Sequence, residues 1–132
     1  IYANNINNLL VRFIRKEKFH DGSDMLVLER LYPIEYNAVS KNDRIHFFDK
    51  FYSDLYELHR NGFLHGDIMH PIGRDPLMLF NNIILTESGL RLIDTGFSVI
   101  KEKEPDIVKY LQMHRQEKYE INTFEQYFTS DL

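Results

Sequence analysis

The stretch from 41 to 61 constrains the fold most, because it is a long amphipathic segment with both a start signal and a stop signal. Ser40, followed three residues later by Asp43, resembles a capping box, in which a hydroxyl and a carboxylate bind free amides of the first helical turn. Gly62 is the residue type that ends helices in a left-handed conformation. The sequence therefore predicts a helix over 41–61, with an apolar stripe made of Ile45, Phe48, Phe51, Leu55 and Leu58.

Short strands are predicted on both sides of this helix. The segment 10–16 alternates weakly between apolar and polar residues, and "MLVLERL" (25–31) is a continuous apolar run. The "DGSD" at 21–24 predicts a hairpin turn between them, because its glycine tolerates a positive φ. Further along, "NIILT" and "GLRLID" predict a second hairpin that turns at "ESG" (87–89).

Further helices are expected toward both ends of the chain. The residues 6–10 are interpreted as the end of a helix. A helix is predicted from Pro105 to about His114, because proline favours the first turn. A separate short helix is predicted after "INT", with Phe124, Tyr127 and Phe128 as its apolar face. Strands followed by helices indicate an α+β fold.

The composition narrows the classes of function. Apolar residues make up 43% of the 132 residues and aromatic residues 14%, which is typical of one globular domain. The net charge of -4 and the pI of about 5.8 disfavour a nucleic-acid partner. The absence of cysteine excludes thiolate chemistry and zinc–thiolate sites.

Two further expectations concern the setting of the chain. No apolar run approaches the roughly 18 residues of a membrane span. The chain starts without an initiator Met and inside an element, so we expect a piece of a larger protein. We expect that protein to be cytoplasmic or delivered to a host cytoplasm.

Three polar residues stand at the ends of apolar elements. Asp67 follows the long helix, Asn82 precedes the first strand of the second hairpin, and Asp94 ends its second strand. Because the entry and exit of a hairpin lie at the same edge, we expect Asp94 to lie near Asn82. Two carboxylates and an amide suit a hard cation such as Mg²⁺, which takes oxygen ligands.

These residues, in this order, resemble the catalytic half of the protein-kinase-like superfamily. The family pattern is His-x-Asp, then an Asn, then Asp-x-Gly after a short hairpin. The corresponding segments are "HGD" (65–67), "NNIIL" (81–85) and "LRLIDTGFS" (90–98). The chain looks most like compact atypical kinases of the Rio type and like aminoglycoside phosphotransferases.

The resemblance implies an α+β, protein-kinase-like fold with two parts. Residues 1–31 are the remnant of an amino-terminal lobe, comprising the end of a helix, two strands and the hinge. Residues 32–132 are a mostly helical carboxy-terminal lobe with a small β-hairpin. The missing part of the amino-terminal lobe is expected in the same chain or in another one.

The resemblance also implies the roles of the three polar residues. Asp67 is the catalytic residue that orients the acceptor hydroxyl or accepts its proton. Asn82 and Asp94 are the metal ligands that hold Mg²⁺ or Mn²⁺ against the phosphates of ATP. Asn82 is favoured over Asn81, because "NIIL" matches the strand that follows this residue in the family.

Further residues are implied to bind the nucleotide or to support the site. His65 is structural and hydrogen-bonds the backbone near the Asp-x-Gly turn, and Gly96 carries that turn. Leu28 is the gatekeeper, and the backbone from Glu29 to Leu31 pairs with the adenine edge. Ile84 and Ile93 form the floor of the nucleotide pocket.

The chain departs from the family pattern in several places. Asn82 follows Asp67 by fifteen residues where the family has five, which implies an insertion that bulges outward. Thr95 replaces the usual Phe, and Gly66 replaces an Arg, which argues against control by activation-loop phosphorylation. The sequence has no Gly-rich loop or phosphate-binding lysine of the family type.

The function expected from the resemblance is a kinase that moves the γ-phosphoryl group of ATP to a hydroxyl. A protein Ser or Thr is slightly favoured over a small molecule as acceptor. The alternatives are a pseudokinase or nucleotide-binding interaction module without catalysis, and a purely structural α+β domain. Within the insertion, His70 and Arg74 are weaker candidates for a functional role.

Overall fold

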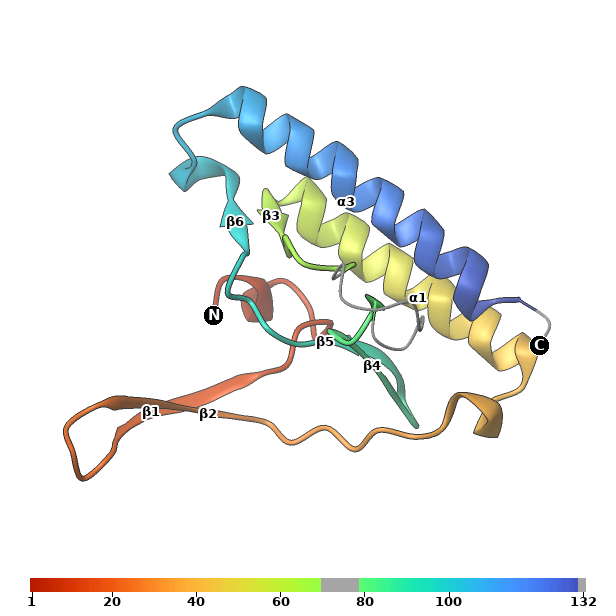
Figure 1. Cartoon of the computed structure of the whole chain (residues 1–132), viewed down its shortest axis with the longest axis horizontal. Coiled ribbons are helices and arrows are strands. Elements are labelled where there is room, and N and C mark those ends of the chain that lie inside the picture. Colours follow the sequence, from red (N-terminus) through yellow and green to blue (C-terminus); the bar gives the residue numbers. More distant parts are fainter. Residues whose placement is uncertain (70–78, 131–132) are drawn as a thin grey trace.

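The computed structural model describes residues 1–69 and 79–130, which form an α+β arrangement (Figure 1). The long helices α1 and α3 run side by side in opposite directions, and two of the short antiparallel strand pairs lie against one side of them (Figure 1). Short 3₁₀ turns connect these elements. The bounds are β1 Phe13–Lys18, β2 Asp24–Leu28, α1 Lys41–Arg60, β3 Phe63–Leu64, β4 Ile83–Thr86, β5 Gly89–Leu92, β6 Val99–Ile100 and α3 Ile107–Phe128.

Helix α1 begins and ends where the local sequence signals place it. The Ser40 hydroxyl accepts a hydrogen bond from the backbone N–H of Asp43 at 3.2 Å. Gly62 follows the helix with φ of +81°, the left-handed conformation that glycine adopts without strain. The predicted stripe is buried except for Ile45, which is 36% exposed, and Tyr52 beside it is also exposed rather than part of the core.

Helix α3 corrects the prediction of two separate helices, because it continues through the "INT" segment. It begins after Asp106, whose carboxylate accepts from the backbone N–H of Lys109, and not at Pro105. Ile121, Phe124 and Phe128 are nearly fully buried against α1 and the loops below it. This packing outweighs the low helix propensity of the asparagine and threonine in "INT".

Both predicted hairpins are present. β1 pairs with β2 across the "DGSD" turn, and β4 pairs with β5. A third pair joins β3 to β6 through Phe63 with Ile100 and Leu64 with Val99, and no local sequence signal indicates it. The residues 6–10, interpreted as a helix end, are not helical; the nearby helical turn is a 3₁₀ turn at Ala3–Asn5.

A buried arginine joins the two long helices. Arg44 on α1 donates from Nε to the carbonyl of Phe128 at 3.0 Å and from its terminal nitrogens to Val39 and Ser130. Its guanidinium also lies 4.4 Å from the ring centroid of Tyr36. These contacts satisfy carbonyls at the end of α3 and so fix that end against the start of α1.

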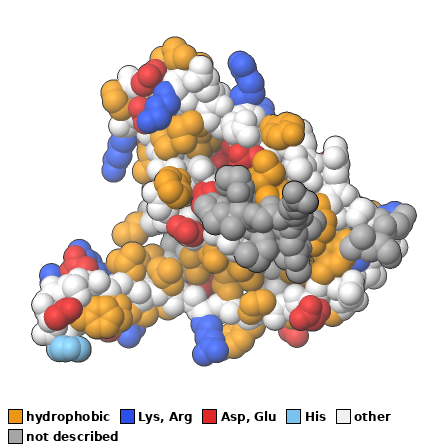
Figure 2. All heavy atoms as spheres, in the orientation of Figure 1, with side chains coloured by type: hydrophobic (Ala, Val, Ile, Leu, Met, Phe, Trp, Pro, Cys, Tyr) orange, Lys and Arg blue, Asp and Glu red, His pale blue; other side chains and the backbone are white. Residues whose placement is uncertain are grey.

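The β1–β2 ribbon projects away from the helices (Figure 1), and Figure 2 shows hydrophobic side chains along it. Ile14, Leu26 and Leu28 are between 44% and 62% exposed on this ribbon. A two-stranded ribbon by itself is only marginally stable in water. The apolar side chains of this ribbon are exposed and are not part of the hydrophobic core. Within the described residues, no helix is both long and apolar enough to cross a membrane.

Candidate functional site

The "HGD" segment is a tight turn that only glycine permits at its centre. Gly66 has φ of +86°, and a Cβ at this position would lie 2.1 Å from the carbonyl oxygen of Phe97. This contact is far closer than atoms tolerate, so the backbone after β3 and the backbone before β6 approach at a point where no side chain fits. The glycine found in place of the family's arginine is therefore required by this geometry.

His65 holds this turn to the end of β5. Its Nε2 lies 2.7 Å from the carbonyl oxygen of Ile93, and its Nδ1 accepts from the backbone N–H of Asp67 at 3.1 Å. A carbonyl only accepts and a backbone N–H only donates, so these two partners specify the neutral tautomer with its proton on Nε2. The side chain is fully buried. It thus connects Asp67 to the residue immediately before Asp94.

Asn82 contacts Asp67 directly. Its amide nitrogen lies 3.0 Å from the main-chain oxygen and 3.1 Å from the carboxylate Oδ2 of Asp67. Both partners are acceptors, so the Nδ2 side of the amide must face Asp67 and its Oδ1 must face away. Asn82 is buried and Asn81 is exposed, which distinguishes the two neighbouring asparagines.

Asp94 is joined to this pair through its neighbour. The N–H of Ile93 donates to the carbonyl of Asn82 at 2.9 Å, which extends the β4–β5 ladder by one bond. Asp94 itself has φ of +62°, the left-handed region that Asp and Asn tolerate better than most residues. Its Oδ1 accepts from the N–H of Gly96 at 3.1 Å. The turn therefore has its left-handed residue at Asp94, whereas Gly96 has no positive φ.

Sequence reasoning missed Glu117, which holds the turn from the opposite side. Glu117 on α3 accepts from the backbone N–H groups of His65 at 3.1 Å and Gly66 at 2.7 Å. It also accepts from Nε2 of His59 at 2.6 Å and is only 3% exposed. Burial by itself raises the pKa of Glu117, but the hydrogen bonds and the charge of His59 lower it more, so the net pKa lies below its ordinary value.

A second missed carboxyl lies one turn further along α3. Glu120 accepts from the backbone N–H of Met69 at 2.9 Å. Desolvation raises the pKa of Glu120 above its ordinary value, and the negative charges of Glu117 and Asp67 add to this effect. In the sequence, the spacing of the two glutamates in "QEKYE" indicates that they share one face of a helix. This spacing does not indicate which residues that face contacts.

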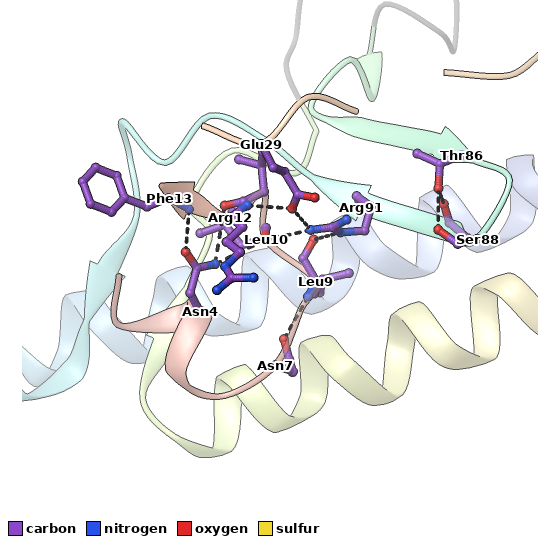
Figure 3. A network of polar contacts seen from close by, with 12 residues as sticks. Asn4, Asn7, Leu9, Leu10, Arg12, Phe13, Glu29, Thr86, Ser88 and Arg91 are labelled. Carbon is purple, nitrogen blue, oxygen red and sulfur yellow. Dashed lines mark hydrogen bonds and ion pairs between the residues drawn. The ribbon is translucent and has the colours of Figure 1, made fainter. Parts of the chain in front are cut away.

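The predicted hinge is tied to the second hairpin (Figure 3). The Glu29 carboxylate accepts from the guanidinium of Arg91 on β5 and from the backbone N–H of Arg12. Arg91 also donates to the carbonyls of Leu9 and Leu10. Burial raises the pKa of Glu29, but the bond from Arg91 and the N–H of Arg12 lower it more, so the net pKa lies below its ordinary value.

The residues predicted to bind the nucleotide line different depressions. Leu28 and Asp94 line a groove between the β1–β2 ribbon, the first residues of the chain and the Asp94 turn. Glu29 and Leu31 line another depression beside the β4–β5 turn. Ile84 lies in an apolar groove that extends toward the end of α3, and Ile93 is half-buried beside Asn82. None of these three grooves of the described structure is lined by all of them.

The oxygen donors present suit a hard divalent cation. Asp94 is exposed, while Asn82 is buried with its Oδ1 turned away from Asp67; carboxylate and amide oxygens are of the type that Mg²⁺ binds. Within the described part of the chain, no three His, Asp or Glu side chains cluster as a metal site. The predicted metal ligands, Asn82 and Asp94, are not such a cluster, because they comprise one amide and one carboxylate and would be completed by oxygens of a nucleotide. His70 and Arg74 lie outside the described residues.

No family model matches the chain, and no curated protein matches it. Among solved structures, the kinase PK-1 of Cydia pomonella granulovirus matches with a TM-score of 0.54 and 14% sequence identity. The match covers 75% of this chain and 36% of that chain, so this chain spans about a third of the length of that kinase. A likeness at this identity shows the fold alone. The chain therefore has an α+β, protein-kinase-like fold.

Proposed function

We propose that the chain is the catalytic lobe of a kinase-like phosphotransferase that uses ATP and Mg²⁺. The observation that carries this proposal is the contact between Asn82 and Asp67, which His65 and Ile93 connect to Asp94. Hydrogen bonds therefore link the backbone around Asp67, Asn82 and Asp94, which are far apart in the sequence. These three residues occur in the same order along the chain as in the kinase-like pattern. The acceptor is a hydroxyl, either of a protein Ser or Thr or of a small molecule.

In the proposed reaction, the acceptor oxygen attacks the γ-phosphorus of ATP. The bond from that phosphorus to the bridging oxygen of ADP breaks, and ADP leaves. Asp67 orients the hydroxyl and takes its proton, while Asn82 holds the Asp67 carboxylate in place through Oδ2. Asp94 and Oδ1 of Asn82 would hold Mg²⁺, which would supply neutralisation of charge on the phosphates.

The test is transfer of ³²P from ATP to a mixture of protein and small-molecule hydroxyl acceptors by the full-length protein. Asp67→Asn keeps the size of the side chain and removes the carboxylate, so transfer should fall by about 10²-fold or more. Asp49→Asn on the exposed face of α1 is the matched control and should leave transfer unchanged. Equal transfer by the wild type and Asp67→Asn would contradict the role of Asp67.

The second candidate is a nucleotide-binding module without catalysis. The residues predicted to bind the nucleotide line different depressions in the described structure, so nucleotide binding has to be tested separately from phosphoryl transfer. Calorimetry with ATP and Mg²⁺ separates the candidates. Asp94→Asn is a clean probe, because asparagine also tolerates the left-handed backbone at this position. Binding that Asp94→Asn weakens, without any transfer by the wild type, would support the module and overturn the enzyme.

A further inference from the structure

The segment 65–69 is anchored to α3 at both of its ends. Glu117 accepts from the N–H groups of His65 and Gly66, and Glu120 accepts from the N–H of Met69. The two glutamates are three residues apart, so their side chains lie on the same face of the helix. Between the two anchors, Ile68 is fully buried in the core.

This arrangement places Asp67 in a short bridge between fixed points. The backbone N–H of Asp67 is bound by His65, and its carboxylate is bound by Asn82. The anchor before Asp67 is Glu117, which is buried and paired with His59. Within the described residues, the anchor after Asp67 is the contact from the N–H of Met69 to the half-buried carboxyl of Glu120.

From this geometry we infer that Glu120 is a positioning residue, which sets the orientation of Asp67 by holding the N–H of Met69. The inference rests on the proposed phosphotransferase function and adds a residue to it. A carboxylate accepts a backbone N–H more strongly than a protonated carboxyl does, so the anchor depends on the ionisation of Glu120. The rate of transfer then depends on that ionisation as well.

The groups around Glu120 make its ionisation sensitive to pH. Glu117 on the same helix and Asp67 in the loop both carry negative charge near it, and Gln116 hydrogen-bonds to it. Desolvation and then the charges of Glu117 and Asp67 raise the pKa of Glu120, and the bonds from Met69 and Gln116 offset only part of this, so the pKa lies above its ordinary value. Protonation of Glu120, and weakening of the Met69 anchor, therefore begin at a higher pH than for an exposed glutamate.

The test compares Glu120→Gln and Glu120→Ala with Glu125→Gln, which lies on the exposed face of the same helix. In Glu120→Ala the acceptor for Met69 is lost, so kcat for ³²P transfer should fall by about tenfold. The KM for ATP should stay within about twofold, because the contacts of Glu120 involve the loop and not the residues assigned to ATP. Urea denaturation of each variant checks that it folds.

Glu120→Gln separates positioning from simple stabilisation. The glutamine keeps an oxygen acceptor but does not titrate, so the ratio of wild-type kcat to variant kcat should be largest at neutral pH. It should approach one as the pH falls below the pKa of Glu120. Amide hydrogen exchange at Met69 should accelerate in Glu120→Ala and not in Glu125→Gln. This readout does not require activity.

Two outcomes overturn the inference and can be told apart from failure of the proposed function. Transfer by the wild type, with a wild-type to Glu120→Gln ratio that does not change with pH, overturns the positioning role alone. Unchanged exchange at Met69 in Glu120→Ala overturns the anchor itself. Absence of transfer by the wild type overturns the proposed phosphotransferase, and the role of Glu120 in it.

Discussion

The amide nitrogen of Asn82 lies within 3.1 Å of both the main-chain oxygen and the carboxylate of Asp67, although the two residues are fifteen positions apart in the sequence. This contact joins the two residues that flank the extra segment. The residues between Asp67 and Asn82 therefore do not keep these two predicted site residues apart. The side chain of Asn82 has both an acceptor and a donor to offer, and the donor side is committed to Asp67.

Replacing Asn82 with alanine should destabilise the protein and disable the site. The change leaves two oxygens of Asp67 without this buried donor, which costs about 1–3 kcal/mol in the free energy of unfolding. Asn81→Ala is the matched control, because Asn81 is exposed and adjacent. Urea denaturation measures the difference, and equal losses for the two variants would contradict the contact between Asn82 and Asp67.

Gly66→Ala should be far more disruptive than Gly22→Ala. Both glycines have almost the same φ, +86° and +88°, so both variants bear the left-handed penalty of about 1–2 kcal/mol. Only Gly66 has backbone atoms of Phe97 within 2.8 Å of the added Cβ, whereas Gly22 has open space. We expect Gly22→Ala to fold and Gly66→Ala to lose several kcal/mol more, as measured by thermal unfolding. Similar melting temperatures would refute the close approach at Phe97.

Glu117→Ala should cost roughly 3–5 kcal/mol, because it leaves His59 and two backbone N–H groups without their buried acceptor. The exposed Glu125→Ala on the same helix should change the free energy of unfolding by less than about 0.5 kcal/mol. The lowered pKa of Glu117 also predicts a pH dependence. Its stabilisation is complete above the ordinary pKa of glutamate and is lost as the pH falls through the lower folded-state pKa. A wild-type curve that does not fall there relative to Glu117→Gln would contradict this.

His114 should make the protein less stable in mild acid. Its Nε2 is buried without a hydrogen-bond partner within the described structure, and its ring lies 4.7 Å from that of His59. Desolvation and then the charge of His59 lower the pKa of His114 below its ordinary value of 6.5. The unfolded chain therefore binds this proton at a higher pH than the folded chain does. Stability should decrease as the pH falls below 6.5 toward the folded-state pKa.

The matched pair for this prediction is His114→Gln and His46→Gln. His46 is exposed on α1, so its replacement should leave the slope of stability against pH unchanged. His114→Gln should flatten the slope between neutral and mildly acidic pH. The measurement is a series of urea denaturations across that interval. An unaltered slope in His114→Gln would assign the acid sensitivity to another group.

Local signals in the sequence were sufficient for α1 and for both hairpins. A serine cap, a helical stripe and a glycine stop act within a few residues of one another, so they can be recognised without knowledge of the rest of the chain. The same holds for the turns at 21–24 and 87–89. The order of Asp67, Asn82 and Asp94 could also be recognised from the sequence, because polar residues at the ends of apolar elements are local features.

Tertiary structure alone decided the remainder. α3 continues through "INT" because Phe124 and Phe128 are buried against partners distant in sequence, and β3 pairs with β6 across more than thirty residues. Glu117 and Glu120 reach the "HGD" segment across separations of about fifty residues. The residues next to Glu117 and Glu120 in the sequence do not indicate which backbone N–H groups these side chains will bind. Burial and a distant N–H give such a residue its role, and both exist only once the chain has folded.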